Sequence, residues 1–187
     1  SDISNWILWV PSFKGYWEPR NVKRVSSRGL KLNLGLEGRL GTLDYRTNMA
    51  YAMTRAINLG DPGVWGDLSH GKQLVFIPVH SGNAMIHLTW RDYHFGWHHH
   101  SYSERFTTSS NDVSRRHRLQ PHFMNDVSMG KMLKTGSLQW MAELKVNNLF
   151  NEDFRSELHQ PMPGRHYLLV LTLGLEQQGR KEREGKY

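Results

Sequence analysis

The stretch that decides the fold is residues 136–175, which reads GSLQWMAELKVNNLFNEDFRSELHQPMPGRHYLLVLTLGL. Apolar and polar residues alternate within it over 137–147 and again from His166, which is the two-residue period of β-strands. The apolar members are Leu138, Trp140, Ala142, Leu144 and Val146 in the first run and Tyr167, Leu169, Leu171, Leu173 and Leu175 in the second. Each run has about ten residues, enough for a tilted strand to cross a bilayer. The pattern fits a membrane barrel, and it also fits a sandwich with one buried face.

The segment between these two runs carries a compact motif. Its residues are Asn147, Asn148, Phe150, Asn151, Phe154, Pro163, Gly164 and Arg165. Asparagine side chains can bond loop backbone groups, the phenylalanines can pack beneath the loop, and Pro163-Gly164 can turn the chain back sharply. We therefore interpret the motif as a structural clamp rather than a ligand site.

This motif between two alternating strands resembles the C-terminal end of the TonB-dependent outer-membrane receptors, whose last two barrel strands are joined by a loop of this form. The resemblance is close over residues 137–175, and the rest of the chain fits the same barrel in pattern. Residues 73–80, QLVFIPVH, also resemble the family's entry into a descending strand, with Val75 where the family usually has proline.

The remaining sequence predicts an all-β, antiparallel up-and-down transmembrane barrel segment of about eight strands. We expect strands at 2–10, 27–38, 42–57, 83–90, 94–104, 119–133, 137–147 and 166–175. Short turns alternate with long loops at 11–26, 58–82, 104–118 and 148–163, the layout typical of outer-membrane barrels.

Composition narrows the function classes. Hydrophobic residues make up 38% of the 187-residue chain, and no apolar run is long enough for a membrane helix. The chain has no cysteine, so disulfides and thiolate chemistry are excluded. Its net charge of +7 is scattered, apart from a basic cluster at residues 115–118 and a basic tail, and no nucleic-acid motif accompanies it. No nucleophile or phosphate-loop motif occurs, so we do not expect an enzyme. We also expect no bound cofactor and no nucleic-acid partner.

The resemblance implies a 22-stranded barrel with an N-terminal plug, of which residues 1–175 would be the C-terminal part and 176–187 a polar tail. The first residues have the pattern of a mid-strand segment, so we expect that the chain begins at a cut. Implied partners are lipid of the Gram-negative outer membrane, the remaining strands and plug, TonB acting through the plug, and an accessory surface lipoprotein. The implied cargo is a scarce nutrient, namely cobalamin, haem or another iron chelate. The alternative is a stand-alone eight-stranded barrel with a structural, adhesive or lipid-modifying role.

Candidate ligand contacts lie in the predicted outer loops. They are Tyr16, Trp17, Trp65, Arg115 and Arg116, since aromatic rings supply stacking area and arginines hold anionic chelates. His94, His98 and His100 share one face of a predicted strand and could ligate a metal or haem iron. A polar wall of the barrel lumen is the alternative interpretation of these histidines.

Overall fold

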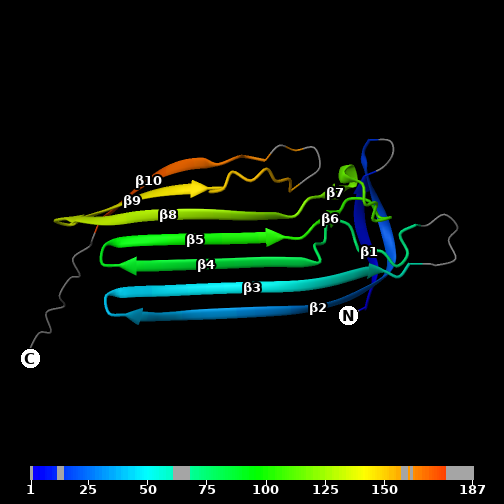
Figure 1. Cartoon of the computed structure of the whole chain (residues 1–187), viewed down its shortest axis with the longest axis horizontal. Helices are drawn as coiled ribbons and strands as arrows, with labels where there is room; N and C mark the ends of the chain where they lie inside the picture. The colour runs from blue at the N-terminus through cyan, green and yellow to red at the C-terminus, as the bar shows by residue number, and fades with distance from the viewer. Residues whose placement is uncertain (1, 12–14, 61–67, 157–159, 161, 176–187) are drawn as a thin grey trace, which may run out of the picture.

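The alternating sequence forms one antiparallel sheet in the computed structural model, which describes residues 2–11, 15–60, 68–156, 160 and 162–175. Eight strands lie in the order β1-β2-β3-β4-β5-β8-β9-β10 (Figure 1). They are β1 (Asp2–Pro11), β2 (Trp17–Leu40), β3 (Leu43–Asn58), β4 (His80–Trp90), β5 (Tyr93–Tyr102), β8 (His122–Thr135), β9 (Leu138–Asn147) and β10 (His166–Leu175). The expected all-β, up-and-down architecture is confirmed.

Tight turns and long connections segregate to opposite ends of the sheet (Figure 1). The β2–β3, β4–β5 and β8–β9 hairpins each have a two-residue turn. In each turn the first residue has a positive φ. That residue is Gly41 (φ 61°), Arg91 (φ 54°) or Gly136 (φ 63°). Glycine adopts this conformation freely, whereas arginine does so at a cost. We call this end of the sheet the turn end and the opposite end the loop end.

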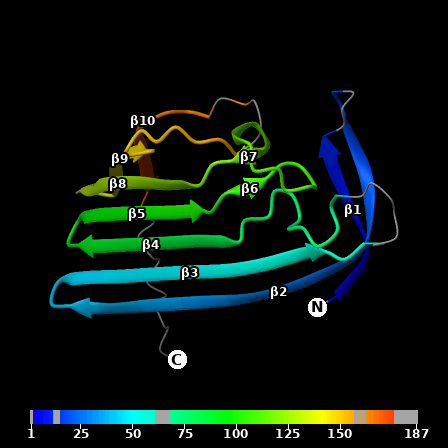
Figure 2. The same cartoon turned by 45° about the vertical axis from the view of Figure 1, so that its right-hand side comes forward.

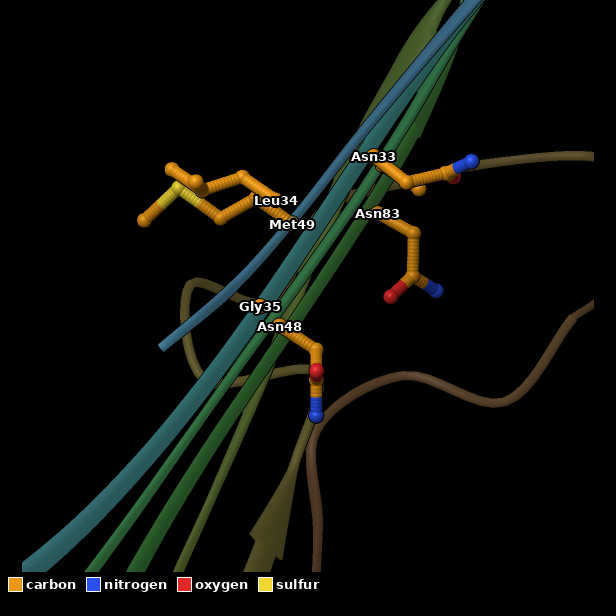
Figure 3. A pocket seen from close by; sticks show the side chains of 7 residues that line it. Asn33, Leu34, Gly35, Asn48, Met49 and Asn83 are labelled. Atoms are coloured by element: carbon orange, nitrogen blue, oxygen red, sulfur yellow. The ribbon is translucent and has the colours of Figure 1, made fainter. Parts of the chain in front are cut away.

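The two faces of the sheet differ in chemistry. Figure 3 shows Leu34 and Met49 on one side of the strands and Asn33, Asn48 and Asn83 on the other. Together with Gly35 and Ala50, these residues line a pocket. Continuous register carries this division across the sheet, so we name the two sides the apolar face and the polar face. The apolar face holds Leu30, Leu32, Leu36, Tyr51, Met53, Ile86, Leu88, Phe95, Trp97, Val127, Met129, Leu138, Trp140, Leu144, Leu169, Leu171 and Leu173.

The sheet is open within the part of the chain that the structure describes. There, β1 pairs with β2 and β10 with β9, and these two edge strands do not pair with each other. The described strands therefore do not close into the eight-stranded barrel of the alternative interpretation. None of the described residues forms a helix long and apolar enough to cross a bilayer.

The boundary of β2 differs from the sequence prediction. The sequence predicts a loop over 11–26, but β2 already begins at Trp17 and pairs with β1 up to Ser26 (Figure 2). The segment 17–24 has no alternating apolar pattern and contains Pro19, which strands tolerate at an edge. Backbone pairing with β1 extends the strand through this segment.

The β5–β8 connection contains structure that the sequence pattern does not predict. The short strands β6 (Arg105–Phe106) and β7 (Arg118–Leu119) pair there, and the 3-10 helix η1 (Arg115–His117) lies between them. β8 accordingly begins at His122, later than the expected start at 119. Two-residue strands are too short to show a period, so only the folded connection reveals them.

Candidate ligand site at the loop end of the sheet

The connection between β3 and β4 is fixed to the sheet by Gln73. Its Oε1 accepts a hydrogen bond from the Ala56 N–H at 3.0 Å, and its backbone bridges to Ile57. Its own N–H donates to Asn111 Oδ1, and Asn111 Nδ2 donates back to the Gln73 carbonyl, both at 2.8 Å. This reciprocal pair joins the β3–β4 and β5–β8 connections. Gln73 opens the QLVFIPVH segment, which by sequence indicates only the entry into a strand.

A small apolar core lies beneath these connections. Val25, Ala56 and Leu74 are buried together, and Ile77 packs against them. Beyond this core, the Trp17 ring lies 5.7 Å from the Phe76 ring, and the Phe76 N–H donates to the Phe106 carbonyl at 2.8 Å. The tip of the β1–β2 hairpin is thereby linked to both long connections.

The predicted ligand residues in this region occupy accessible positions. Tyr16 and Trp17 are about half exposed, at 51% and 49%. Arg115 and Arg116 are exposed on η1. Trp65 lies outside the described residues. The structure thus places four of the five candidates on the surface of the loop end, and their role as ligand contacts stays a prediction.

The η1 turn is held by Asp112. Its carboxylate accepts the Ser114 N–H at 2.8 Å and approaches His117 Nδ1 at 2.7 Å. The pKa of Asp112 is lowered, first by the Ser114 backbone hydrogen bond and then by the His117 side chain. Nearby, Arg118 pairs with Glu104 at 2.7 Å, and burial lowers the pKa of Arg105. These contacts present Arg115 and Arg116 on an ordered turn.

Aromatic rings gather on the polar face where β5 and β8 reach the loop end. The His100 ring lies 5.8 Å from His98 and 5.9 Å from His122. The Tyr102 and Phe154 rings each lie 5.3 Å from the His122 ring. His122, which stands isolated in the sequence, is 2% exposed and lies at the centre of this cluster. Cross-strand register between β5 and β8, which the sequence does not show, brings it there.

The three histidines predicted as metal or haem ligands do not all come together. His98 lies beside Asn83 and close to His100. Its Nδ1 is 3.9 Å from the Asp126 carboxylate. His94 is nearer the turn end, where its Nδ1 lies 3.3 Å from Thr89 Oγ1. Among the described residues, no three His, Cys, Asp or Glu side chains form a group able to hold a metal ion. Metal or haem binding by these histidines stays a prediction.

Asn148 closes the loop that follows β9. It has a φ of 52°, and its side chain accepts the Glu152 N–H at 2.8 Å and donates to the Glu152 carbonyl at 2.9 Å. Asn148 is 1% exposed, and its own N–H donates to Asp126. This buried amide therefore satisfies both backbone polar groups of Glu152.

The other motif residues have separate contacts. Asn151 Oδ1 accepts the Arg165 N–H at 2.9 Å, which ties together the two ends of the loop. Asn147 instead lies 3.0 Å from the His166 ring of β10. The expectation that Phe150 packs beneath the loop is wrong, because its side chain is 70% exposed. The role of the motif as a clamp, including Pro163 and Gly164, stays a prediction.

An open, up-and-down sheet with an apolar face, a polar face and all long connections at one end is the layout expected of a barrel segment. The family model described as "TonB dependent receptor-like, beta-barrel" matches residues 1–149. The chain belongs to the TonB-dependent receptor family. This family consists of transporters rather than enzymes. The family match ends within the motif, so the resemblance over 137–175 lies mostly beyond the matched residues.

Solved structures of TonB-dependent receptors share the fold. The ferric citrate transporter FecA aligns over 82% of this chain and 25% of its own, with a TM-score of 0.62 and 15% identity. The ferric-catecholate import receptor Fiu of E. coli K12 aligns over 91% of this chain and 23% of its own, with a TM-score of 0.61 and 17% identity. BauA, the ferric preacinetobactin receptor of Acinetobacter baumannii, aligns over 85% and 30%, with a TM-score of 0.54 and 11% identity.

This chain therefore spans about a quarter of the length of the first two receptors. At these identities the likeness concerns the fold alone. No curated protein matches the chain by sequence.

Proposed function

We propose that this chain is a barrel segment of a TonB-dependent receptor that imports an iron chelate through the outer membrane of a Gram-negative bacterium. The observation that carries the proposal is the open eight-stranded sheet, which has the family's fold and leaves edges for further strands. In this interpretation the apolar face meets lipid, and the polar face lines the lumen. The segment would be the C-terminal part, completed by the remaining strands and a plug that engages TonB.

The chemistry of the loop end supports an anionic chelate as cargo. Arg115 and Arg116 are exposed on an ordered turn, and Tyr16 and Trp17 are accessible at the hairpin tip. Guanidinium groups bind carboxylate and catecholate oxygens, and aromatic rings stack against flat ligands. The three similar receptors carry ferric chelates, as their names state, which favours iron over cobalamin.

An uptake assay tests this proposal. Cells that depend on the full-length receptor would be supplied with ⁵⁵Fe-labelled siderophores, labelled haem or labelled cobalamin, with and without a protonophore. We expect energy-dependent uptake of an anionic ferric chelate. The double change Arg115→Ala/Arg116→Ala should weaken binding, whereas Lys134→Ala, which removes an exposed cation at the turn end, should not. Uptake of cobalamin alone would contradict the iron assignment.

Haem is the second candidate cargo, favoured by the rings of His98, His100, Tyr102 and His122. Imidazole and phenol rings can stack on a porphyrin, and an imidazole can ligate its iron. His98→Ala would then reduce haem uptake and change the absorption spectrum of bound haem. Unchanged haem uptake in this variant would exclude the histidine cluster from the haem route.

A further inference from the structure

Two arginines of neighbouring strands lie side by side on the apolar face. Arg28 of β2 is paired in register with Arg55 of β3, and both side chains are exposed. Directly opposite residues in an antiparallel pair have Cβ atoms about 4.5–5.5 Å apart, and like charges in this arrangement destabilise the sheet. An anion bound between the two guanidinium groups would remove this repulsion.

These arginines stand where the apolar face ends. The next pair toward the turn end is Leu30 with Met53, followed by Leu32 with Tyr51. The Tyr51 hydroxyl lies 2.8 Å from His80 Nδ1, and His80 itself pairs with Met53. The phenol therefore extends its polar tip toward the loop end, as tyrosines do at a membrane boundary. Arg28 and Arg55 lie just beyond this boundary.

On the polar face of the same strands, arginines form ion pairs with carboxylates. Arg39 forms a two-point ion pair with Asp44, and Arg46 lies 3.3 Å from the Glu37 carboxylate. Among the described residues, no ion pair includes Arg28 or Arg55. The acidic residue closest to them in register is Asp2, opposite Ser26. Carboxylates thus lie beside Arg39 and Arg46, whereas none lies directly opposite Arg28 or Arg55.

We propose that Arg28 and Arg55 bind the phosphate group of a lipid in the outer leaflet. The inference rests on the proposed outer-membrane location, in which the apolar face is immersed in acyl chains. A lipid bound with its chains along Leu30 and Met53 would place its headgroup at the two guanidiniums. Arginine forms paired, charge-assisted hydrogen bonds with phosphate, and one phosphate shared by both side chains removes their repulsion.

Lipid retention by the purified receptor tests the proposal. The full-length receptor would be extracted in mild detergent, incubated with diphosphorylated lipid A or phosphatidylcholine, and examined by native mass spectrometry. Arg28→Gln/Arg55→Gln should lower lipid A retention about tenfold or more, since charged hydrogen bonds are lost. Lys131→Gln is the matched control, because Lys131 lies on the same face at the turn end and contacts the Tyr93 ring.

Reversing the charge of Arg28 distinguishes a bound lipid phosphate from two arginines without a ligand. Without a bound phosphate, Arg28→Glu would replace repulsion by a cross-strand ion pair and raise the melting temperature. With a bound phosphate, the same change lowers both lipid A retention and the melting temperature measured in lipid A.

Each remaining outcome has one interpretation. Equal retention by the double glutamine variant and the parent would overturn the lipid site. Equal binding of inorganic phosphate and lipid A by the parent would assign the pair to free phosphate and overturn the lipid source. Absence of the receptor from the outer-membrane fraction would instead contradict the proposed function. Proteolytic resistance of each variant confirms that it has folded.

Discussion

Single residues at the loop end connect segments that are distant in the sequence. Gln73 and Asn111 join two connections, Asn148 closes a third, and Asn151 ties that loop to the start of β10. The side-chain amides of Asn111 and Asn148 each donate and accept, and so satisfy two backbone groups, whereas the Asn151 amide oxygen accepts one backbone N–H. Small changes at these residues should therefore affect assembly more than ligand chemistry.

Gly164 provides a test of the clamp. A Cβ at this position would lie 3.0 Å from Asn151 Oδ1, the atom that accepts the Arg165 N–H. Gly164→Val should push this acceptor away and lower the amount of assembled receptor in membrane fractions, with ligand affinity per folded molecule near normal. Asn151→Ala should act in the same direction because it removes the acceptor. Normal assembly with lost binding would make the loop part of the ligand site.

We expect the order of the η1 turn, which Asp112 holds, to depend on pH. Because its pKa is lowered in the folded chain, its contribution is fully present above the ordinary aspartate pKa of about 4. That contribution is lost as the pH falls through the lowered value. We expect protease cleavage within residues 108–117 to increase on acidification, measured with an acid-active protease. Asp112→Asn should show the increased cleavage already at neutral pH, and equal cleavage of both proteins at neutral pH would contradict this role.

At the scale of elements, the alternation within each strand sets which face it presents. Leu144 is 50% exposed on the apolar face, between Met129 of β8 and Leu169 of β10. If this face meets lipid, Leu144→Arg should cost about 2–4 kcal/mol when the site is near the bilayer centre. Met141→Arg is the matched control, because Met141 belongs to the same strand but to the polar face. Urea titration of the receptor folded in lipid vesicles measures both, and equal costs would contradict the facing.

At the scale of the whole molecule, the open edges determine what the chain can do by itself. The outer edge of β10 and much of that of β2 have no strand partner within the described residues. Unpaired backbone groups are very costly in lipid. Expressed alone and refolded in detergent, this chain should oligomerise or aggregate. A monomeric species with the heat-modifiable gel mobility of a closed barrel would contradict the segment interpretation, and the full-length receptor serves as the positive control.

The sequence by itself determined the class of fold. Long runs such as Leu30 to Leu36 and Leu169 to Leu173 show the two-residue period directly, because every second side chain meets the same surroundings. Gly41 and Gly136 lie in the short gaps between the predicted strands 27–38 and 42–57 and between 119–133 and 137–147, and few other residues adopt a positive φ without cost. The motif from Asn147 to Arg165 indicated the family through its residue types and spacing alone.

Only the tertiary structure decided which residues from different strands meet. The register of β5 against β8 brings His122 to His100, and that of β2 against β3 places Arg28 opposite Arg55. The pairing of β1 with β2 extends a strand through a segment without apolar alternation. Hydrogen bonds between backbones carry no side-chain identity, so a strand's own sequence shows its faces but not its partner's alignment. The clusters at the loop end therefore arise from the pairing of strands and not from any single stretch of sequence.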